Sequence, residues 1–227
     1  MTAKNPARPW VVATDFDGTI TRLDVGNEIH RSLKPDEFGA LQATYRSGGM
    51  TLKELQRQMW ENFAMNEATF KKRALEFGAL RDGANHFLES CLDAGIPVYV
   101  ASCGIRTYIE TVLDTMLTPK ARSAILGIEC NRAVFSAHGI SQFIPPPSSP
   151  ASPVPLDKGA WIQSIRREKH PHSKVLGIGN GSSDRSFAGQ VDTLAATEAL
   201  ARWCEAESIP YVAFESFYEL LEAKLML

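Results

Sequence analysis

Short apolar runs alternate with amphipathic segments along most of this chain. The runs Trp10–Ala13, Val98–Ala101 and Val175–Ile178 have the length and the unbroken hydrophobicity of buried strands. Helical patterns at 106–116 and 158–169 lie between the second and the third of these runs. This alternation is typical of βαβ units and predicts an α/β protein with a largely parallel sheet.

The segment 23–81 breaks this alternation, because it carries helical patterns and no convincing strand. Thr51 and Glu54 have the spacing of a capping box, which opens a helix with two reciprocal hydrogen bonds. Asn66 is suitably placed to cap a further helix. We therefore expect a stretch of helices alone between the first strand and the rest of the sheet.

The expected fold is a Rossmann-like parallel sheet core with an all-helical cap inserted after its first strand. The core would comprise residues 1–22 and 82–227, and the cap would comprise residues 23–81, over the strand tips. Further short strands are expected, in chain order, at 125–128, 132–135, 140–143, 191–195 and 211–214. A loop is expected at 144–155, which holds six prolines and three serines.

Composition narrows the class of protein. The chain has 227 residues, of which 44% are hydrophobic and 22% charged, as is ordinary for a soluble globular protein. A net charge of −2 argues against nucleic acid or an anionic membrane as partner, and no apolar run approaches a membrane span. The four cysteines form no C-x-x-C pair and residues 1–9 are too polar for a signal peptide, so we expect a cytoplasmic protein. The oligomeric state stays open, a homodimer included.

Two carboxylates follow the first strand directly, in the motif Asp15-Phe16-Asp17-Gly18-Thr19. Gly18 allows the sharp turn that such a strand end needs. Ligands of parallel α/β sheets bind at the carboxyl ends of the strands. Two close carboxylates repel each other, so the pair favours a shared proton or a hard cation such as Mg²⁺. Taken alone, the motif is equally compatible with an ordinary polar turn.

Three later segments carry polar residues at comparable places. Ser102 follows the second strand and precedes a helix, where a hydroxyl and free backbone N–H groups can bind an anion. Lys158 opens a helix, and the stretch 179–184 is a glycine turn that ends in an aspartate. Each has an ordinary alternative, respectively an N-cap, a surface lysine and a polar turn. Together with Asp15 and Asp17 they supply the nucleophile, acid–base group, metal ligands and positive charge that phosphoryl transfer requires.

The order of these motifs resembles that of the haloacid dehalogenase superfamily phosphatases. The resemblance is carried by Asp-x-Asp-Gly-Thr at 15–19, then Ser102, Lys158 and the glycine turn that ends in Asp184. The helical insertion directly after the first motif is similar to the cap of the phosphoserine-phosphatase-like branch. The stretches 15–24 and 211–219 look most like the methionine-salvage phosphatases of that group.

This resemblance implies a magnesium-dependent phosphatase that acts on a small-molecule phosphate ester through an aspartyl-phosphate. Asp15 would attack phosphorus and bind Mg²⁺. Asp17 would protonate the leaving alcohol, later activate water, and bind the metal through its backbone carbonyl. Asp184 would support the metal directly or through water. Asn180 stands where the family has another metal carboxylate, and because an amide brings no charge, weaker metal binding is expected.

The resemblance also implies which residues bind the substrate. The phosphoryl group would be bound by Ser102, Cys103, Gly104 and Lys158. Substrate specificity is expected in the cap, at Asp24 and Arg46. Asp24 matches an acidic position that faces the substrate in the phosphoserine enzymes, but it is equally suited to start a helix. Arg46 has the alternative of a solvated surface arginine.

Two alternatives to this function remain open at the level of sequence. One is a phosphatase for another metabolite, such as phosphoserine or a sugar phosphate, because many substrates share these motifs. The other is a catalytically weak, ligand-binding relative with an altered metal site, which only Asn180 suggests. The presence of both Asp15 and Asp17 favours the enzyme.

Overall fold

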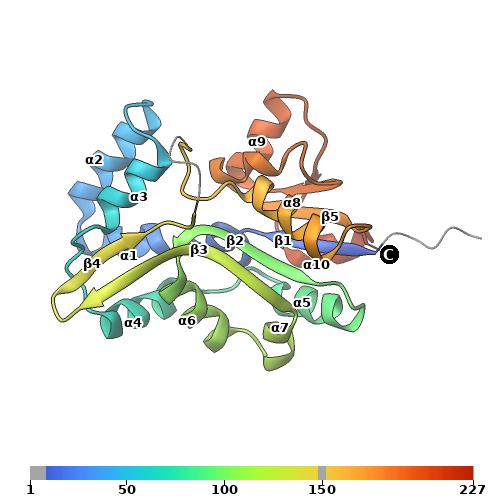
Figure 1. The fold of residues 1–227 in the computed structure, drawn as a ribbon, viewed down its shortest axis with the longest axis horizontal. Helices are drawn as coiled ribbons and strands as arrows, with labels where there is room; N and C mark the ends of the chain where they lie inside the picture. The colour runs from blue at the N-terminus through green and yellow to red at the C-terminus, as the bar shows by residue number, and fades with distance from the viewer. Residues whose placement is uncertain (1–8, 148–151, 227) are drawn as a thin grey trace, which may run out of the picture.

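A computed structural model describes residues 9–147 and 152–226 of the protein (Figure 1). Within these residues, seven strands form one sheet in the order β4-β3-β2-β1-β5-β6-β7. Neighbouring strands are parallel except β3 and β4, which form an antiparallel hairpin at one edge. The strands are β1 (Trp10–Thr14), β2 (Val98–Ile105), β3 (Ile125–Ser136), β4 (Gly139–Ile144), β5 (Lys174–Gly179), β6 (Thr193–Ala196) and β7 (Val212–Ala213).

Helices connect these strands, and four of the five helices between β1 and β2 lie within residues 23–81. These four are α1 (Val25–Leu33), α2 (Pro35–Arg46), α3 (Leu52–Trp60) and α4 (Glu67–Phe77). The later helices are α5 (Ala84–Asp93), α6 (Arg106–Met116), α7 (Pro119–Ser123), α8 (Lys158–Lys169), α9 (Glu198–Ala206) and α10 (Phe217–Glu222). Two short helical turns follow β1 and β5, η1 (Phe16–Ile20) and η2 (Ser182–Phe187). The α/β fold with a mostly parallel sheet, expected from the sequence, is thereby confirmed.

Helices cover both faces of the sheet (Figure 1). Successive β1 residues point to opposite faces, since Val12 belongs to one buried apolar cluster and Val11 and Ala13 belong to another. The cluster with Val12 includes apolar side chains of α5, α6 and α10, and it extends into α1, α3 and α4. The cluster with Val11 includes Ile162 of α8 and Leu200 of α9. Burial on both faces explains why the central strands are apolar throughout.

Local sequence signals account for the ends of several helices. Thr51 and Glu54 form the expected capping box at the start of α3. The side chain of Asn66 accepts a hydrogen bond from the backbone N–H of Thr69 and caps α4, as expected. The helical patterns at 106–116 and 158–169 coincide with α6 and α8.

Two expectations about strands were wrong. The segments 125–128 and 132–135 are one continuous strand, β3, because its first half pairs with β2 and its second half pairs with β4. The polar residue Asn131 is buried in the middle of this strand, where its side-chain amide donates a hydrogen bond to the carbonyl of Cys103. Long-range pairing and this hydrogen bond stabilise a strand that the local pattern had divided in two.

The second strand is also longer than its apolar run. β2 continues through Ser102, Cys103 and Gly104 to Ile105, so α6 does not begin directly after Ser102. The pairing register with β3 shifts between Ala101 and Ile105, which marks an irregular strand end. The backbone N–H groups beside Ser102 therefore belong to this irregular strand end and not to the first turn of a helix.

Some expectations concern residues that lie outside the described part of the chain. Residues 1–8 carry most of the segment considered as a signal peptide, and residues 148–151 belong to the proline-rich loop. In the described part, no helix combines the length and apolar character that crossing a bilayer would require.

Candidate active site

The carboxyl ends of β1, β2 and β5 border a cavity of about 160 Å³. From these strand ends and the loops that follow them, the cavity is lined by Asp15, Asp17, Ser102, Cys103, Gly104, Asn180, Gly181, Ser182 and Ser183. From α1, α2, α3 and α6 and their caps, it is lined by Asp24, Gly26, Asn27, Gln42, Tyr45, Leu52, Leu55, Gln56, Trp60 and Tyr108. The helices that follow β1 thus contribute one wall of the cavity, and the carboxyl ends of the central strands contribute the other.

The turn after β1 determines where Asp15 and Asp17 lie. The backbone N–H of Asp15 still donates to Ile178 of β5, at 2.9 Å, so this residue is held by the sheet. Gly18 has φ +71°, and a Cβ at this position would lie 2.2 Å from Asn180 Nδ2. A glycine is therefore required for both the backbone conformation and the close approach of the two loops.

Lys158 connects Asp15 with Asp184. Its Nζ lies 2.6 Å from Asp15 Oδ1 and 2.6 Å from Asp184 Oδ1, and all three residues are buried. Burial alone would lower the pKa of Lys158, but the two carboxylates outweigh it and raise that pKa, so the lysine is charged. Lys158 does not line the cavity itself. Its ammonium group is therefore close to a bound ligand only where that ligand contacts Asp15.

The carboxyl group of Asp15 has a raised pKa despite this lysine. Burial, followed by the neighbouring charge of Asp184, raises the pKa of Asp15 to about 7, against the opposing effect of Lys158. Asp184 is fully buried, and its Oδ2 accepts the backbone N–H groups of Asn180 and Gly181, each at 2.9 Å. The carboxylate of Asp184 thereby holds the loop after β5 against Lys158.

Asp17 is held by donors from two helices. Its Oδ1 accepts the backbone N–H of Val25 at 2.9 Å, at the start of α1. Its Oδ2 accepts the hydroxyl of Tyr108 from α6 at 2.5 Å, with Ser102 Oγ at 3.4 Å. Burial and the charge of Asp24 raise the pKa of Asp17 well above its ordinary value. A carboxyl group with a raised pKa can carry a proton near neutral pH, as a general acid must.

The strand end at 102–104 combines a hydroxyl with a closely packed glycine. Ser102 Oγ accepts the backbone N–H of Gly104 at 2.9 Å. A Cβ on Gly104 would lie 1.9 Å from Tyr108 Oη and 2.6 Å from Asp17 Oδ2, so any side chain there would displace both groups. Burial raises the pKa of Cys103 to about 11, so this thiol is a packed group and not a thiolate nucleophile.

Asn180 is anchored by residues on both sides of it. Its Nδ2 donates to Glu198 Oε2 at 3.1 Å, and its Oδ1 accepts the hydroxyl of Thr19 at 3.3 Å. Glu198 in turn pairs with Arg81 at 2.9 Å. Because the Glu198 carboxylate only accepts hydrogen bonds, the amide nitrogen must face it, and the amide oxygen therefore faces the loop after β1.

The donor set at this site is suited to a hard divalent cation. Asp15 and Asn180 bring side-chain oxygens to the cavity, whereas Asp184 lies behind it, with its two oxygens bound to Lys158 and to the loop after β5. Burial and the charge of Asp184 raise the pKa of Asp15, and a bound cation would favour the charged form of this carboxyl group. In residues 9–147 and 152–226, no group of three or more His, Cys, Asp or Glu side chains is arranged to hold a metal ion unaided. A bound cation would therefore need amide, backbone or water oxygens as well. Mg²⁺ accepts such a mixed set, because it usually keeps several of its waters.

The two expected specificity residues have different positions. Asp24 lines the cavity and also caps α1, where it accepts the backbone N–H of Asn27 at 2.8 Å. It therefore both faces the cavity and starts a helix, the two alternatives that the sequence had left open. Burial raises the pKa of Asp24 to about 6. Arg46 is exposed at the end of α2 and does not line the cavity, whereas its neighbour Tyr45 does. The structure thus does not bring Arg46 to this site, in agreement with the alternative of a surface arginine.

Two residues at the site had escaped the sequence analysis. Arg81 is buried and donates to the carbonyls of Gly18, Thr19 and Glu215, which ties the loop after β1 to the C-terminal region. Its place at the expected boundary between cap and core, residues 81 and 82, was the one available signal. Tyr108 lies on the apolar face of α6, where its aromatic ring is indistinguishable in sequence from a core residue.

Comparison with known proteins relates this chain to a family of hydrolases. The family model described as haloacid dehalogenase-like hydrolase matches residues 12–189. A 2-hydroxy-3-keto-5-methylthiopentenyl-1-phosphate phosphatase of Geobacillus kaustophilus is 26% identical over 94% of this chain and 94% of its own length. The phosphatase of the same name from Exiguobacterium sp. is 28% identical over 92% of this chain and 94% of its own length.

Solved structures support the fold. A substrate-bound phosphoserine phosphatase superposes with a TM-score of 0.72 at 13% identity, covering 96% of this chain and 99% of the other. A hydrolase from Salmonella enterica serovar Typhi gives 0.74 at 16% identity, covering 96% of this chain and 72% of the other. The family model spans the chain from the strand before Asp15 through the turn that holds Asp184. The curated relatives of this chain described above are named as phosphatases. The protein belongs to the haloacid dehalogenase-like hydrolases, a family of enzymes.

Proposed function

We propose that this protein is a phosphatase that hydrolyses a small-molecule phosphomonoester through an aspartyl-phosphate. One observation carries the proposal: Asp15 and Asp17 line the same cavity at a strand end, with Lys158 holding Asp15 from behind. A nucleophile and an acid–base group are then available to one bound substrate, beside a fixed positive charge.

The residues have complementary roles in this reaction. The carboxylate of Asp15 attacks phosphorus, and the bond from phosphorus to the leaving oxygen breaks while Asp17 gives that oxygen its proton. Asp17 then accepts a proton from water, whose oxygen attacks the phosphorus of the aspartyl-phosphate. The bond from phosphorus to Asp15 breaks, which releases inorganic phosphate and restores the Asp15 carboxylate. The raised pKa of Asp17 favours its first role as a proton donor.

The remaining site residues hold the charged group. Ser102, Cys103 and Gly104 line the cavity together with Asp15, and the hydroxyl of Ser102, which accepts the N–H of Gly104, has its own proton to donate to a phosphoryl oxygen. Lys158 neutralises charge at the oxygen of Asp15 that it contacts. These donors are fixed before substrate arrives, and such preorganised donors stabilise the charge that develops during transfer.

Mg²⁺ is the cofactor that this donor set favours. Asp15, the backbone carbonyl of Asp17, Asn180 and, directly or through water, Asp184 would hold it. When bound, it would supply positive charge to the nucleophile and to the phosphoryl oxygens. Asn180 brings no charge to that set, and Glu198 contacts the amide nitrogen of Asn180.

Residues 23–81 act in this proposal as a cap that shields the site and selects the substrate. No lysine, arginine or histidine lines the cavity within the described part of the chain, and the cap wall presents amides, apolar groups and Asp24. Asp24 could accept the ammonium group of phosphoserine, but the carboxylate of that substrate would find no cation on this wall. The wall therefore favours an ester with an uncharged organic group, in line with the name of the methionine-salvage relatives.

The test of phosphatase activity compares wild type with Asp15→Asn. Wild type is expected to hydrolyse p-nitrophenyl phosphate in the presence of Mg²⁺, and folded Asp15→Asn is expected to lose turnover, because an amide cannot replace the attacking carboxylate. A wild type that binds phosphate esters without turnover would support the alternative of a catalytically weak, ligand-binding relative. A screen that finds phosphoserine preferred over uncharged alkyl phosphates would contradict the assignment of substrate class.

A further inference from the structure

The hydroxyl of Tyr108 makes the shortest of the polar contacts described around Asp17. It donates to Asp17 Oδ2 at 2.5 Å, while the backbone N–H of Val25 donates to Oδ1 at 2.9 Å. Both carboxylate oxygens therefore have a donor, one from α6 and one from the start of α1. Two donors from separate elements fix the plane of the carboxylate as well as its position.

The backbone around Tyr108 leaves room for this hydroxyl. A Cβ on Gly104 would lie 1.9 Å from Tyr108 Oη, and a Cβ on Gly26 would lie 3.0 Å from it. Glycines on two different elements thus border the one polar atom of the tyrosine. A phenylalanine in the same place would fill the apolar pocket equally well, so packing alone does not account for the hydroxyl.

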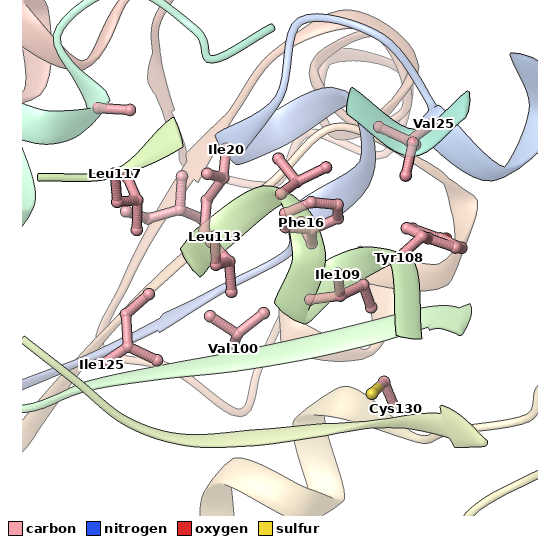
Figure 2. Packing of buried hydrophobic residues seen from close by; sticks show 14 of the residues in the cluster. Phe16, Ile20, Val25, Val100, Tyr108, Ile109, Leu113, Leu117, Ile125 and Cys130 are labelled. Atoms are coloured by element: carbon pink, nitrogen blue, oxygen red, sulfur yellow. The ribbon is translucent and has the colours of Figure 1, made fainter. Parts of the chain in front are cut away.

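The ring of Tyr108 is held firmly by the core. Its centroid lies 6.1 Å from that of Phe16 and 6.0 Å from that of Phe70, and the residue is fully buried. Figure 2 shows Tyr108 beside Val25 and Phe16, with Ile109 and Leu113 of the same helix packed toward the sheet. Burial and the charge of Asp17 raise the pKa of Tyr108, so its hydroxyl stays protonated and keeps a proton to donate.

We propose that Tyr108 is a positioning residue, which holds the Asp17 carboxyl in the orientation from which it protonates the leaving group. This inference rests on the proposed phosphatase function and on the role of Asp17 within it. Neither the family motifs nor the sequence pattern of α6 assigns Tyr108 a part in the reaction. Without the hydroxyl, Asp17 would retain the Val25 donor and could rotate about it.

The leaving group of the substrate provides a direct test. Phenolate is a poorer leaving group than p-nitrophenolate and needs more help from a general acid. We compare kcat/KM for phenyl phosphate and p-nitrophenyl phosphate in wild type and Tyr108→Phe, since this constant reports steps up to the first irreversible transfer. Tyr108→Phe is expected to lower kcat/KM for phenyl phosphate about 10- to 100-fold, as loss of a hydrogen bond to a charged group would. For p-nitrophenyl phosphate the expected loss is below about threefold, because general acid help matters less there.

Two further variants separate positioning from other roles. Tyr99→Phe also removes one hydroxyl from a buried tyrosine, whose partner is His170 at 2.9 Å, and it should leave both constants unchanged. In the double variant Asp17→Asn/Tyr108→Phe, activity on phenyl phosphate should equal that of Asp17→Asn, because Tyr108 acts only through Asp17. A further tenfold loss in the double variant would mean that Tyr108 acts on the substrate itself.

The outcomes distinguish this inference from the proposed function. If wild type hydrolyses p-nitrophenyl phosphate and Tyr108→Phe lowers both constants equally, or neither, the positioning role is wrong and the phosphatase stands. If wild type hydrolyses neither ester with Mg²⁺ present, both proposals are overturned. Thermal unfolding of Tyr108→Phe and Tyr99→Phe checks that any selective loss is not a general loss of fold.

Discussion

The ammonium group of Lys158 lies 2.6 Å from the carboxylate of Asp15, although 143 positions separate the two residues in the chain. The same nitrogen lies 2.6 Å from Asp184, and neither carboxylate has another lysine or arginine among its described salt-bridge partners. The single positive charge of Lys158 therefore pairs with two buried carboxylates. The stability of the site and its reactivity both depend on this balance of charge.

Removal of Lys158 should be strongly destabilising. In Lys158→Met, Asp15 and Asp184 would be left buried without their cation, and breaking a buried pair in this way typically costs about 3–5 kcal/mol. Urea denaturation in metal-free buffer measures the loss of unfolding free energy. The same loss should shrink in Lys158→Met/Asp15→Asn, because one of the uncompensated charges is then absent. Additive effects of the two substitutions would argue against a shared charge balance.

Replacement of Asp17 tests the acid–base role. Asp17→Asn keeps the backbone carbonyl but removes the proton donor, so kcat should fall by about 10²–10⁴-fold, the usual contribution of general acid–base catalysis. Steady-state kinetics on phenyl phosphate and thermal unfolding, measured on the same preparation, separate catalysis from folding. A loss below about tenfold, with chemistry shown to limit the rate, would contradict the assigned role.

A carboxylate in place of Asn180 should act differently with and without metal. Asn180→Asp removes the amide donor to Glu198 and sets two carboxylates against each other, so stability without metal should fall. With Mg²⁺ bound, the added charge should strengthen metal binding, so half-maximal activity should need less Mg²⁺. Thermal unfolding and activity are each measured across a Mg²⁺ titration.

The double variant Asn180→Asp/Glu198→Gln is the matched control. The glutamine amide can again donate across the contact, so apo stability should recover in part, because the charge that pairs with Arg81 is lost, while the tighter Mg²⁺ response remains. Equal Mg²⁺ requirements in wild type and Asn180→Asp would mean that Asn180 does not lie at the metal.

His30 should make the stability of the protein depend on pH. Its ring is buried beside Phe63 and Trp60, with centroids 5.1 and 5.9 Å away, and burial lowers its pKa from 6.5. Glu37, 3.6 Å away, opposes this shift, and Lys34 reinforces it. Because the folded pKa lies below the unfolded one, the unfolded chain binds more protons, and stability is lost as the pH falls below about 6.5.

The slope of Tm against pH is the measurement for this prediction. Between about pH 7 and pH 5, wild type should lose Tm more steeply than His30→Phe, which cannot take up the proton. Asp15 and Asp17 also titrate with raised pKa values, but they are present in both proteins and cancel in the comparison. Equal slopes would show that His30 does not gain a proton on unfolding in this range.

Several features of the site could be predicted from local sequence. Asp15 and Asp17 directly follow an apolar run, and Asn180 and Asp184 follow another, which is enough to put both pairs at strand ends. Parallel strands then bring those ends to one edge of the sheet, whatever the details of packing. The capping box at Thr51 was equally local, because its two hydrogen bonds involve residues three apart.

Other features depend on contacts that no local pattern contains. β3 is continuous because β2 and β4 pair with its two halves, and these partners are distant in sequence. Arg46 and Tyr45 are adjacent in α2, yet only Tyr45 faces the cavity, and the packing of the helix decided which. Neither outcome can be obtained from periodicity alone.

The sequence by itself determined the kind of chemistry this protein can perform, through the residue types at the ends of its strands. Only the tertiary structure decided that Lys158 is a buried bridge and that Tyr108 donates to Asp17. The reason is physical: a residue's type and local period specify its element and its face, whereas its partners across the cavity depend on how distant elements pack. Charges and hydroxyls far apart in the chain acquire their roles only when burial removes the water that would otherwise surround them.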